Sequence, residues 1–87
     1  MNCTVYVIWN SEHGRYYVGQ TADLEKRLAE HNDPENFSSK FTKKFSGEWI
    51  LLHKEQHPDR AAGMRREREL KTGKGRDWLR GHILPQA

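Results

Sequence analysis

The sequence predicts an α+β fold, a small three-stranded antiparallel sheet flanked by helices in the order β-β-α-β-α-α. Three observations predict it: two β-rich segments separated by turn residues, a third apolar run later in the chain, and helix-forming segments between and after them. A chain of 87 residues has room for one hydrophobic core, so we expect a single domain covering residues 1–87.

Three segments have the composition of strands. Residues 3–9 and 15–21 are rich in β-branched and aromatic side chains, and the polar residues between them are typical of a turn. These two segments are therefore predicted to form an antiparallel hairpin. Residues 48–55 have a continuous apolar centre, which favours a third strand covered on both faces.

The length of the hairpin loop decides whether two tyrosines share a face of the sheet. A loop of residues 11–14 would pair Ile8 with Tyr17 and place Tyr6 diagonally from Tyr17, within aromatic reach. A loop longer by one residue, without a bulge, would separate them. The ordinary alternative for such tyrosines, taken singly, is cross-strand packing.

Three helices are predicted. The first covers residues 22–32, and the second covers residues 58–72, with Pro58 at its start and Gly73 as its stop. A short closing helix is expected over residues 75–84, with apolar side chains on one side. Residues 33–47 are polar and basic and are predicted to form a long loop.

The first predicted helix carries two cationic or titratable side chains on its apolar face. With steps of about 100° per residue, Arg27 and His31 fall on the same arc as Leu24 and Leu28. One interpretation is a guanidinium and an imidazole that face the sheet and bind a phosphate. The alternative is that Arg27 extends to the edge of the helix and His31 is a hydrogen-bonded boundary residue.

The same projection separates two carboxylates of the second helix. Glu67 falls on the arc of Met64 and Leu70, whereas Glu69 lies on the opposite side, where it can pair with Arg65. A carboxylate on a core-facing stripe needs a cation or a metal ion as its partner. Glu67 is therefore the candidate metal ligand.

Two glycines indicate close approaches of other groups to the backbone. Gly19 lies within a predicted strand. A glycine weakens a strand unless another group packs closely against its backbone, and a phosphate is one such group. Gly63 lies one helical turn before Glu67 and allows the helix to pack closely on the sheet. Tyr16 points away from Tyr17 and is expected in the core.

Charge and composition indicate a polyanion as partner. The net charge is +3, and the basic residues are clustered, which suits a nucleic-acid backbone as well as it suits a solvated surface. A single cysteine excludes an internal disulfide. No signal peptide and no membrane span is recognisable, so we expect a cytoplasmic location and no membrane partner.

Together these residues resemble the motifs of the GIY-YIG nuclease family. The segments Thr4-Val5-Tyr6 and Tyr17-Val18-Gly19 are similar to its two name-giving motifs. Arg27 with His31 looks like its helix motif, and Glu67 looks like its metal-binding glutamate. This resemblance implies a three-stranded antiparallel sheet flanked by helices and hydrolysis of DNA phosphodiester bonds with Mg²⁺ or Mn²⁺. The family includes homing endonucleases and an enzyme subunit of DNA repair.

The resemblance also implies a role for each residue. Glu67 would hold one divalent cation, and Tyr17 would position or deprotonate the attacking water. Arg27 would neutralise the transition state, and Tyr6 would orient the phosphate or the water. Some relatives carry a lysine where this chain has Gln20, so activation of Tyr17 falls to His31 or the cation.

Further residues are expected to bind the nucleic acid, with DNA preferred over RNA. They lie near Tyr17, in the long basic loop and on the second helix: Gly19, Gln20, Lys40, Lys43, Lys44 and Lys71. A protein partner could supply targeting, and the activity could be weak or dependent on that partner. The alternative function is a non-catalytic DNA- or RNA-binding module that retains the nuclease fold.

Overall fold

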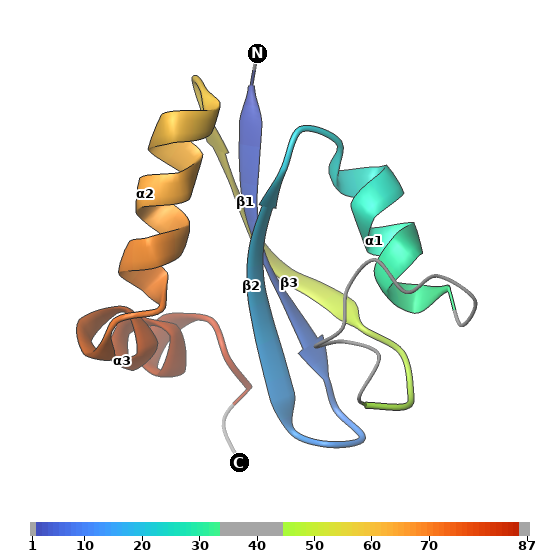
Figure 1. Cartoon of the computed structure of the whole chain (residues 1–87). Helices are drawn as coiled ribbons and strands as arrows, with labels where there is room; N and C mark the ends of the chain where they lie inside the picture. Colours follow the sequence, from blue (N-terminus) through green and yellow to red (C-terminus); the bar gives the residue numbers. More distant parts are fainter. Residues whose placement is uncertain (1, 34–44, 86–87) are drawn as a thin grey trace.

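The strands form one antiparallel sheet at the centre of the molecule (Figure 1). In this computed structural model, which describes residues 2–33 and 45–85, the strands are β1 (Cys3–Asn10), β2 (Arg15–Thr21) and β3 (Ile50–His57). Their spatial order is β2-β1-β3, so β1 is central and both neighbours are edge strands. The predicted fold class and the order β-β-α-β-α-α are confirmed.

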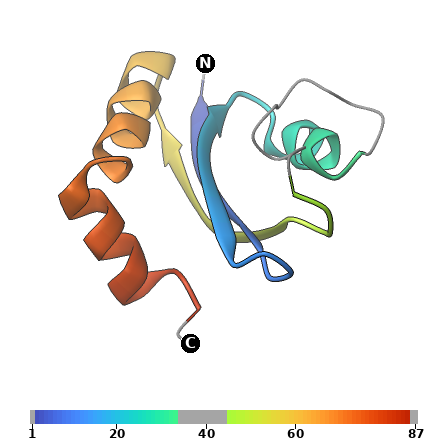
Figure 2. The same cartoon turned by 60° about the horizontal axis from the view of Figure 1, so that its bottom comes forward.

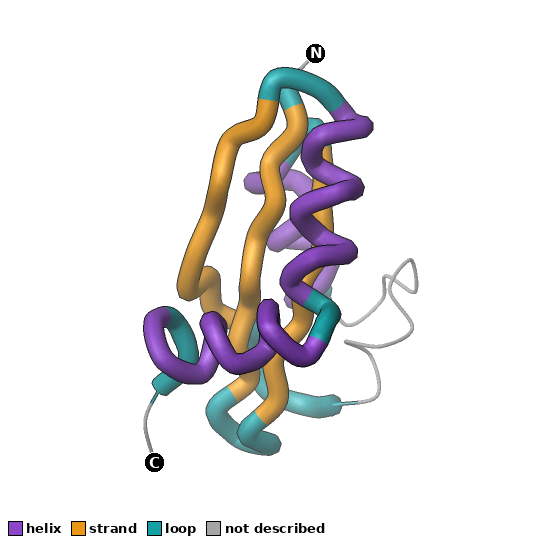
Figure 3. The backbone as a smooth tube through the Cα atoms, turned by 90° about the vertical axis from the view of Figure 1, so that its left-hand side faces the viewer, coloured by secondary structure: helices purple, strands orange, loops and turns teal. Residues whose placement is uncertain are grey.

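Helices cover both faces of this sheet. The described part of the chain contains α1 (Leu24–Asn32), α2 (Arg60–Leu70) and α3 (Gly73–His82). Helix α1 lies on one side of the sheet, and α2 and α3 lie on the other (Figures 1 and 2). Helix α2 runs along the strands, whereas α3 crosses one end of the sheet (Figure 3). Strand β2 therefore presents an edge that α1 and α2 approach from opposite sides.

The register of the hairpin is the one predicted for a loop of residues 11–14. Ile8 is paired with Tyr17, and Tyr6 is paired with Gly19. The rings of Tyr6 and Tyr17 consequently lie on the same face, with their centroids 6.3 Å apart. This face is the one that α1 covers, because Tyr6 packs in a cluster together with Leu28.

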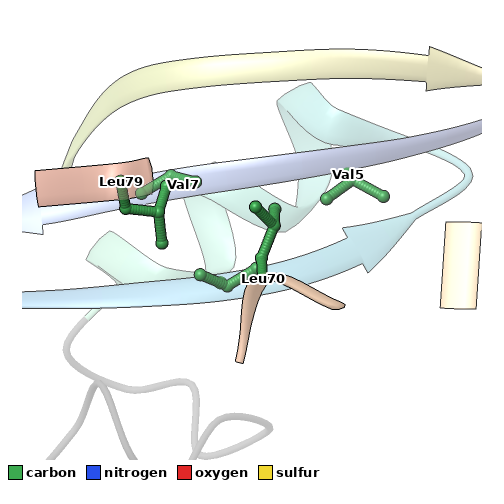
Figure 4. Packing of buried hydrophobic residues seen from close by; sticks show 5 residues of the cluster. Val5, Val7, Leu70 and Leu79 are labelled. Carbon is green, nitrogen blue, oxygen red and sulfur yellow. The ribbon is translucent and has the colours of Figure 1, made fainter. Parts of the chain in front are cut away.

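Alternation along β1 divides the core into two layers. Val5 and Val7 pack against Leu70 of α2 and Leu79 of α3, and all four are almost completely buried (Figure 4). On the opposite face, the buried side chains include Tyr6. Successive strand residues point to opposite faces, so one strand supplies both the apolar core and the tyrosine of the candidate site.

Close packing of α2 on the sheet depends on Gly63, as predicted. A Cβ atom at this position would collide with the Sγ atom of Cys3 on the central strand. Tyr16, expected in the core, is half-buried and packs against the cluster on the α2 and α3 side. Gly63 therefore sets how closely α2 can approach β1.

The predicted helix bounds were wrong at several ends, because polar capping residues set where each helix begins. The Asp23 side chain accepts the backbone N–H of Lys26, so α1 starts at residue 24 and not at 22. Asp59 caps α2 in the same way, and this helix ends at Leu70. Gly73 is the first residue of α3 and not a stop, because the Thr72 hydroxyl caps that helix.

The third strand also departs from its prediction. It covers residues 50–57, and not 48–55, and its exposure alternates because it is an edge strand covered on one face. Ile50 is 44% exposed. The pairing with β1 shifts between Val7 and Ile8, which are opposite His53 and Leu51, so Leu52 forms a bulge.

The long basic loop predicted over residues 33–47 falls mostly outside the described residues. Lys40, Lys43 and Lys44 belong to the part that is not described. Within residues 2–33 and 45–85, none of the helices is sufficiently long and apolar to span a bilayer.

Candidate active site

Three of the predicted site residues meet on the α1 side of the sheet. The Tyr6 hydroxyl lies 2.8 Å from Nε2 of His31, which is only 2% exposed, and Arg27 also donates a hydrogen bond to this hydroxyl. A guanidinium can only donate, so the Tyr6 hydroxyl oxygen accepts from Arg27 and shares a second hydrogen bond with His31.

Helix α1 is anchored at both ends, which fixes these two side chains. Its first turn is capped by Asp23, and its last residue, Asn32, exchanges two hydrogen bonds with the backbone of Trp49, at 2.7 and 2.9 Å. The face with Arg27 and His31 is turned toward the sheet, as predicted. Arg27 is half-buried and also donates to Glu30 at 3.4 Å.

The electrostatics of this cluster keep Tyr6 neutral and Arg27 charged. Burial, followed by the neighbouring Tyr17, raises the pKa of Tyr6 to about 12, although Arg27 acts in the opposite direction. Burial would lower the pKa of Arg27, but hydrogen bonds to Tyr6 and Glu30 raise it above its ordinary value. Tyr6 is therefore suited to orient a group and unsuited to accept a proton.

Tyr17 lies between this cluster and helix α2. Its ring centroid is 5.2 Å from that of His31. On its other side, the ammonium of Lys71 lies 5.9 Å from the centre of the Tyr17 ring. A cation at this distance from an aromatic ring is electrostatically attracted to it. Sequence reasoning placed Lys71 among the nucleic-acid contacts and missed its position beside this tyrosine.

Gly19 is required by the tyrosines themselves. A Cβ atom at this position would lie 2.5 Å from the Tyr6 hydroxyl oxygen, 2.7 Å from its Cζ and 2.9 Å from Cε2 of Tyr17. The Tyr6 ring therefore crosses over Gly19 toward the edge of β2. The close approach expected at Gly19 is real, but an aromatic ring makes it in this structure.

Glu67 is the half-buried carboxylate of α2 that was predicted to face inward. Its side chain is 24% exposed, compared with 65% for Glu69. Its carboxylate accepts a hydrogen bond from Lys71 at 2.9 Å, and its charge contributes to the raised pKa of Tyr6. Glu67 thus lies at the β2 edge, within electrostatic reach of the tyrosines.

Two details of the predicted α2 face were wrong. Met64, placed on the arc of Glu67, is 41% exposed, because the buried stripe runs through Gly63 and Leu70. Glu69 pairs with Arg66, at 2.6 Å, where Arg65 had been predicted. The inward face of the helix is rotated slightly relative to the projection, and this rotation also turns Arg66 toward the sheet.

Glu67 fits the requirements of a hard divalent cation. Within residues 2–33 and 45–85, no group of three His, Cys, Asp or Glu side chains could enclose a metal ion. Mg²⁺ does not need such a cage, because it keeps several waters and binds through one or two carboxylates and substrate phosphates. Glu67 borders a surface hollow of about 290 Å³ together with Gln20 and Lys71, which leaves room for waters and a phosphate.

A half-buried ion pair fixes the orientation of α2. Arg66 donates two hydrogen bonds to Glu55 of β3, at 2.9 and 3.0 Å, and its guanidinium lies 5.1 Å from the Trp78 ring centre. His53 and His57 also contact the Glu55 carboxylate. This bidentate contact joins β3, α2 and α3, and it sets the rotation of the helix that carries Glu67.

This ion pair makes the protein sensitive to acid. Burial alone would raise the pKa of Glu55, but hydrogen bonds from Arg66, His53 and His57 lower it to about 2. Because the pKa is depressed on folding, the stabilisation is complete above the unfolded value of about 4.5 and is lost toward pH 2. We expect the free energy of unfolding to fall by about 2 kcal/mol between pH 5 and pH 2.5 because of this group.

Urea titrations at several pH values measure this loss. Glu55→Gln should lower stability at pH 7 and flatten its decline between pH 5 and pH 2.5, since the variant has no carboxylate to protonate. Glu69→Gln, at an exposed position, is the control and should keep the wild-type pH dependence. An unchanged decline in Glu55→Gln would contradict the assignment.

The remaining predicted contacts divide into two groups. Gln20 accepts a hydrogen bond from Cys3 and lines the hollow beside Glu67, and Lys71 lies between Glu67 and Tyr17. Lys40, Lys43 and Lys44 lie outside the described residues. In the described part of the chain, sequence reasoning also missed a basic groove next to Tyr17, because its residues are distant in the sequence.

Comparisons with known proteins point to one protein family. Residues 2–79 match the family model described as the GIY-YIG catalytic domain. A UPF0213 protein of Halobacterium salinarum is 39% identical over 67 residues, which cover 77% of this chain and 82% of that protein. The solution NMR structure of a UPF0213 protein from Bacillus halodurans has a TM-score of 0.53 at 27% identity, over 91% of this chain and 82% of that one. Because the family model matches residues 2–79, this chain belongs to the GIY-YIG family, a family of nucleases.

Proposed function

We propose that this protein is a metal-dependent endonuclease that hydrolyses DNA phosphodiester bonds. One observation carries the proposal: Tyr6, Tyr17, Arg27 and His31 converge at the β2 edge, which Glu67 borders from the other face of the sheet. Cations, hydroxyls and one carboxylate in this arrangement suit in-line displacement at a phosphate. The nuclease family of the chain supports the same chemistry.

Arg27 and Tyr6 bind and orient the phosphate. Arg27 is cationic and half-buried, so its guanidinium interacts more strongly with the developing negative charge than a fully solvated cation would. The neutral Tyr6 hydroxyl is held by Arg27 and His31 and positions the phosphate or the water. His31 acts through Tyr6, whose hydroxyl it holds by a hydrogen bond.

Tyr17 positions the attacking water and accepts its proton. A neutral phenol is a weak base, so proton transfer to Tyr17 needs a neighbouring positive charge. Lys71 supplies such a charge on the α2 side of the ring, where Gln20 supplies none. Help from His31 remains a second proposed contribution.

Glu67 would hold the divalent cation, Mg²⁺ or Mn²⁺. A bound cation stabilises the negative charge that develops on the phosphate and on the leaving oxygen. Lys71 shares the Glu67 carboxylate in the free protein, and it is therefore positioned to turn to a phosphate when the carboxylate is engaged elsewhere. Its side chain is half-exposed, which permits this movement.

DNA is the proposed substrate, and residues around the candidate active site are proposed to contact its backbone. Gly19 and Gln20 lie at the β2 edge, and Lys71 lies beside the tyrosines. Lys40, Lys43 and Lys44 of the basic loop are proposed to bind the DNA backbone as well. We further propose that a protein partner delivers the domain to its substrate. The proposed role is DNA repair, and the proposed location is the cytoplasm.

The second candidate is a nucleic-acid-binding module without catalysis. The observation that favours it is the ion pair between Glu67 and Lys71, which satisfies the carboxylate in the absence of a metal ion. A binding protein could therefore carry Glu67 without repelling phosphate. The two candidates differ in whether added metal produces cleavage.

A substrate panel separates these functions. Plasmid, single-stranded, branched and RNA substrates are incubated with the protein in Mg²⁺, in Mn²⁺ and in EDTA. We expect cleavage of at least one DNA substrate with metal and none in EDTA, because the charge on the phosphate is then uncompensated. Binding without cleavage under every condition would favour the binding module.

A further inference from the structure

A groove next to Tyr17 is lined by cations from two distant parts of the chain. It has a volume of about 490 Å³ and lies between the start of β2 and helix α3. The side chains that define this basic groove come from both elements and from the end of α2: Arg15, Tyr16, Tyr17, Lys71, Arg76 and Arg80. We propose that the basic groove binds the sugar-phosphate backbone of the nucleic-acid strand that continues from the cleaved bond.

The residues that line the groove carry a net positive charge, although Lys71 is paired with Glu67 beside it. Four of its lining residues are cations, and no carboxylate is among the described residues that line it. Arg76 and Arg80 are exposed to solvent, so their guanidinium groups can reach a ligand. Arg15 is also exposed, but its guanidinium lies over the ring of Phe45, 5.6 Å from the ring centre. Arg80 contacts Asp77 at 3.5 Å, an exposed pair that contributes little and is readily exchanged for a phosphate.

The geometry of α3 fits a chain of phosphates. Arg76 and Arg80 are one helical turn apart, so they leave the same face of α3 about 5–6 Å from each other. This separation is comparable to that of neighbouring phosphates along a strand. Arginine is well suited to such a site because its planar guanidinium donates two parallel hydrogen bonds to one phosphate.

The groove is continuous with the candidate active site. Tyr17 and Lys71 line it. Lys71 also donates a hydrogen bond to Glu67 and lies over the Tyr17 ring, so both residues belong to the candidate active site as well. A strand whose phosphate lies at Tyr17 would therefore meet Arg76 and Arg80 with its next nucleotides. The aromatic Tyr16 is half-buried at the groove wall and provides a surface for a sugar or base. This inference rests on the proposed function, whose nucleic-acid substrate it extends.

Salt-dependent binding tests the groove without requiring cleavage. A labelled DNA oligonucleotide is titrated in EDTA at about 50 to 300 mM salt, with wild-type protein and with the double variant Arg76→Gln/Arg80→Gln. Each lost phosphate contact lowers the slope of log K against log salt by about 0.7–0.9, so the double variant should lose about 1.4–1.8 from this slope. Circular dichroism verifies that the variant is folded.

A matched variant controls for net charge. Arg65→Gln/Lys74→Gln removes two exposed cations of α2 and α3 that do not line the groove. We expect this variant to keep nearly the wild-type salt slope. An equal loss of slope in the two double variants would refute binding in the groove. Because binding is measured in EDTA, a protein that binds through the groove but never cleaves would refute the endonuclease and leave the groove intact. If the protein cleaved DNA but the double variant and the wild type had equal salt slopes, the endonuclease would stand and the groove would be refuted.

Discussion

Glu67→Gln is expected to reduce the single-turnover rate of DNA cleavage by about 100-fold or more. Loss of about 3 kcal/mol of transition-state stabilisation corresponds to this factor, and a metal ligand contributes several kcal/mol. Glutamine has nearly the same shape and keeps an acceptor oxygen for Lys71, so the helix should remain folded. The rate is measured with enzyme in excess over a labelled substrate in Mg²⁺ or Mn²⁺.

Glu69→Gln is the control for this experiment. Glu69 lies two residues away on the same helix, but its side chain is 65% exposed and directed to Arg66. We expect its cleavage rate to stay within about threefold of wild type, since exposed ion pairs contribute about 0–1 kcal/mol. If Glu69→Gln abolished cleavage and Glu67→Gln did not, the assignment of the metal ligand would be wrong.

Gly19→Ala should damage both the stability and the activity of the protein. The added Cβ would lie within 3 Å of atoms of Tyr6 and Tyr17, so at least one ring must move. Overpacking of this kind costs about 1–3 kcal/mol of unfolding free energy. A displacement of about 1 Å in a catalytic group can reduce the rate by about 100-fold. Urea unfolding and single-turnover cleavage measure the two effects.

A second substitution shows whether the collision with Tyr6 is the cause. The closest atom to the added Cβ is the Tyr6 hydroxyl oxygen, at 2.5 Å. Tyr6→Phe removes that oxygen, so the double variant should lose less unfolding free energy than the two single variants added together. Strict additivity would mean that Gly19 is required for another reason.

The position of the two tyrosines follows from the sequence because strand geometry leaves few alternatives. Once the loop is set at residues 11–14, the pairing of Ile8 with Tyr17 determines which side chains share a face. The inward face of α1 was equally accessible, since Leu24 and Leu28 define its stripe. His31 is buried on that face, bonded to Tyr6.

The rotation of α2 was harder to predict. The helix has few apolar residues, so the helical projection predicted that Met64 and Leu70 both face the core. Of these two residues, only Leu70 is buried. The actual rotation depends on the ion pair of Arg66 with Glu55, which comes from β3. Long-range ion pairs of this kind leave no periodic pattern, and the bulge at Leu52 brings Glu55 to its place in an equally non-local way.

The basic groove was missed for the same reason. Arg15 begins the second strand, whereas Arg76 and Arg80 belong to the closing helix, and each is an ordinary surface arginine in the sequence. Their proximity arises only when α3 crosses the end of the sheet (Figure 3). Charge clusters that are assembled by the fold, and not by neighbouring residues, require the three-dimensional structure.

The most direct test of the site is the location of a bound metal ion and phosphate. Tyr17→Phe protein, which should cut slowly, is crystallised with Mn²⁺ and a DNA oligonucleotide, and the anomalous signal of Mn²⁺ is recorded. We predict one Mn²⁺ ion coordinated by Glu67, with a DNA phosphate between this ion and Arg27. Mn²⁺ bound elsewhere, or a phosphate bound while Glu67 stays paired with Lys71, would contradict a metal-dependent nuclease site.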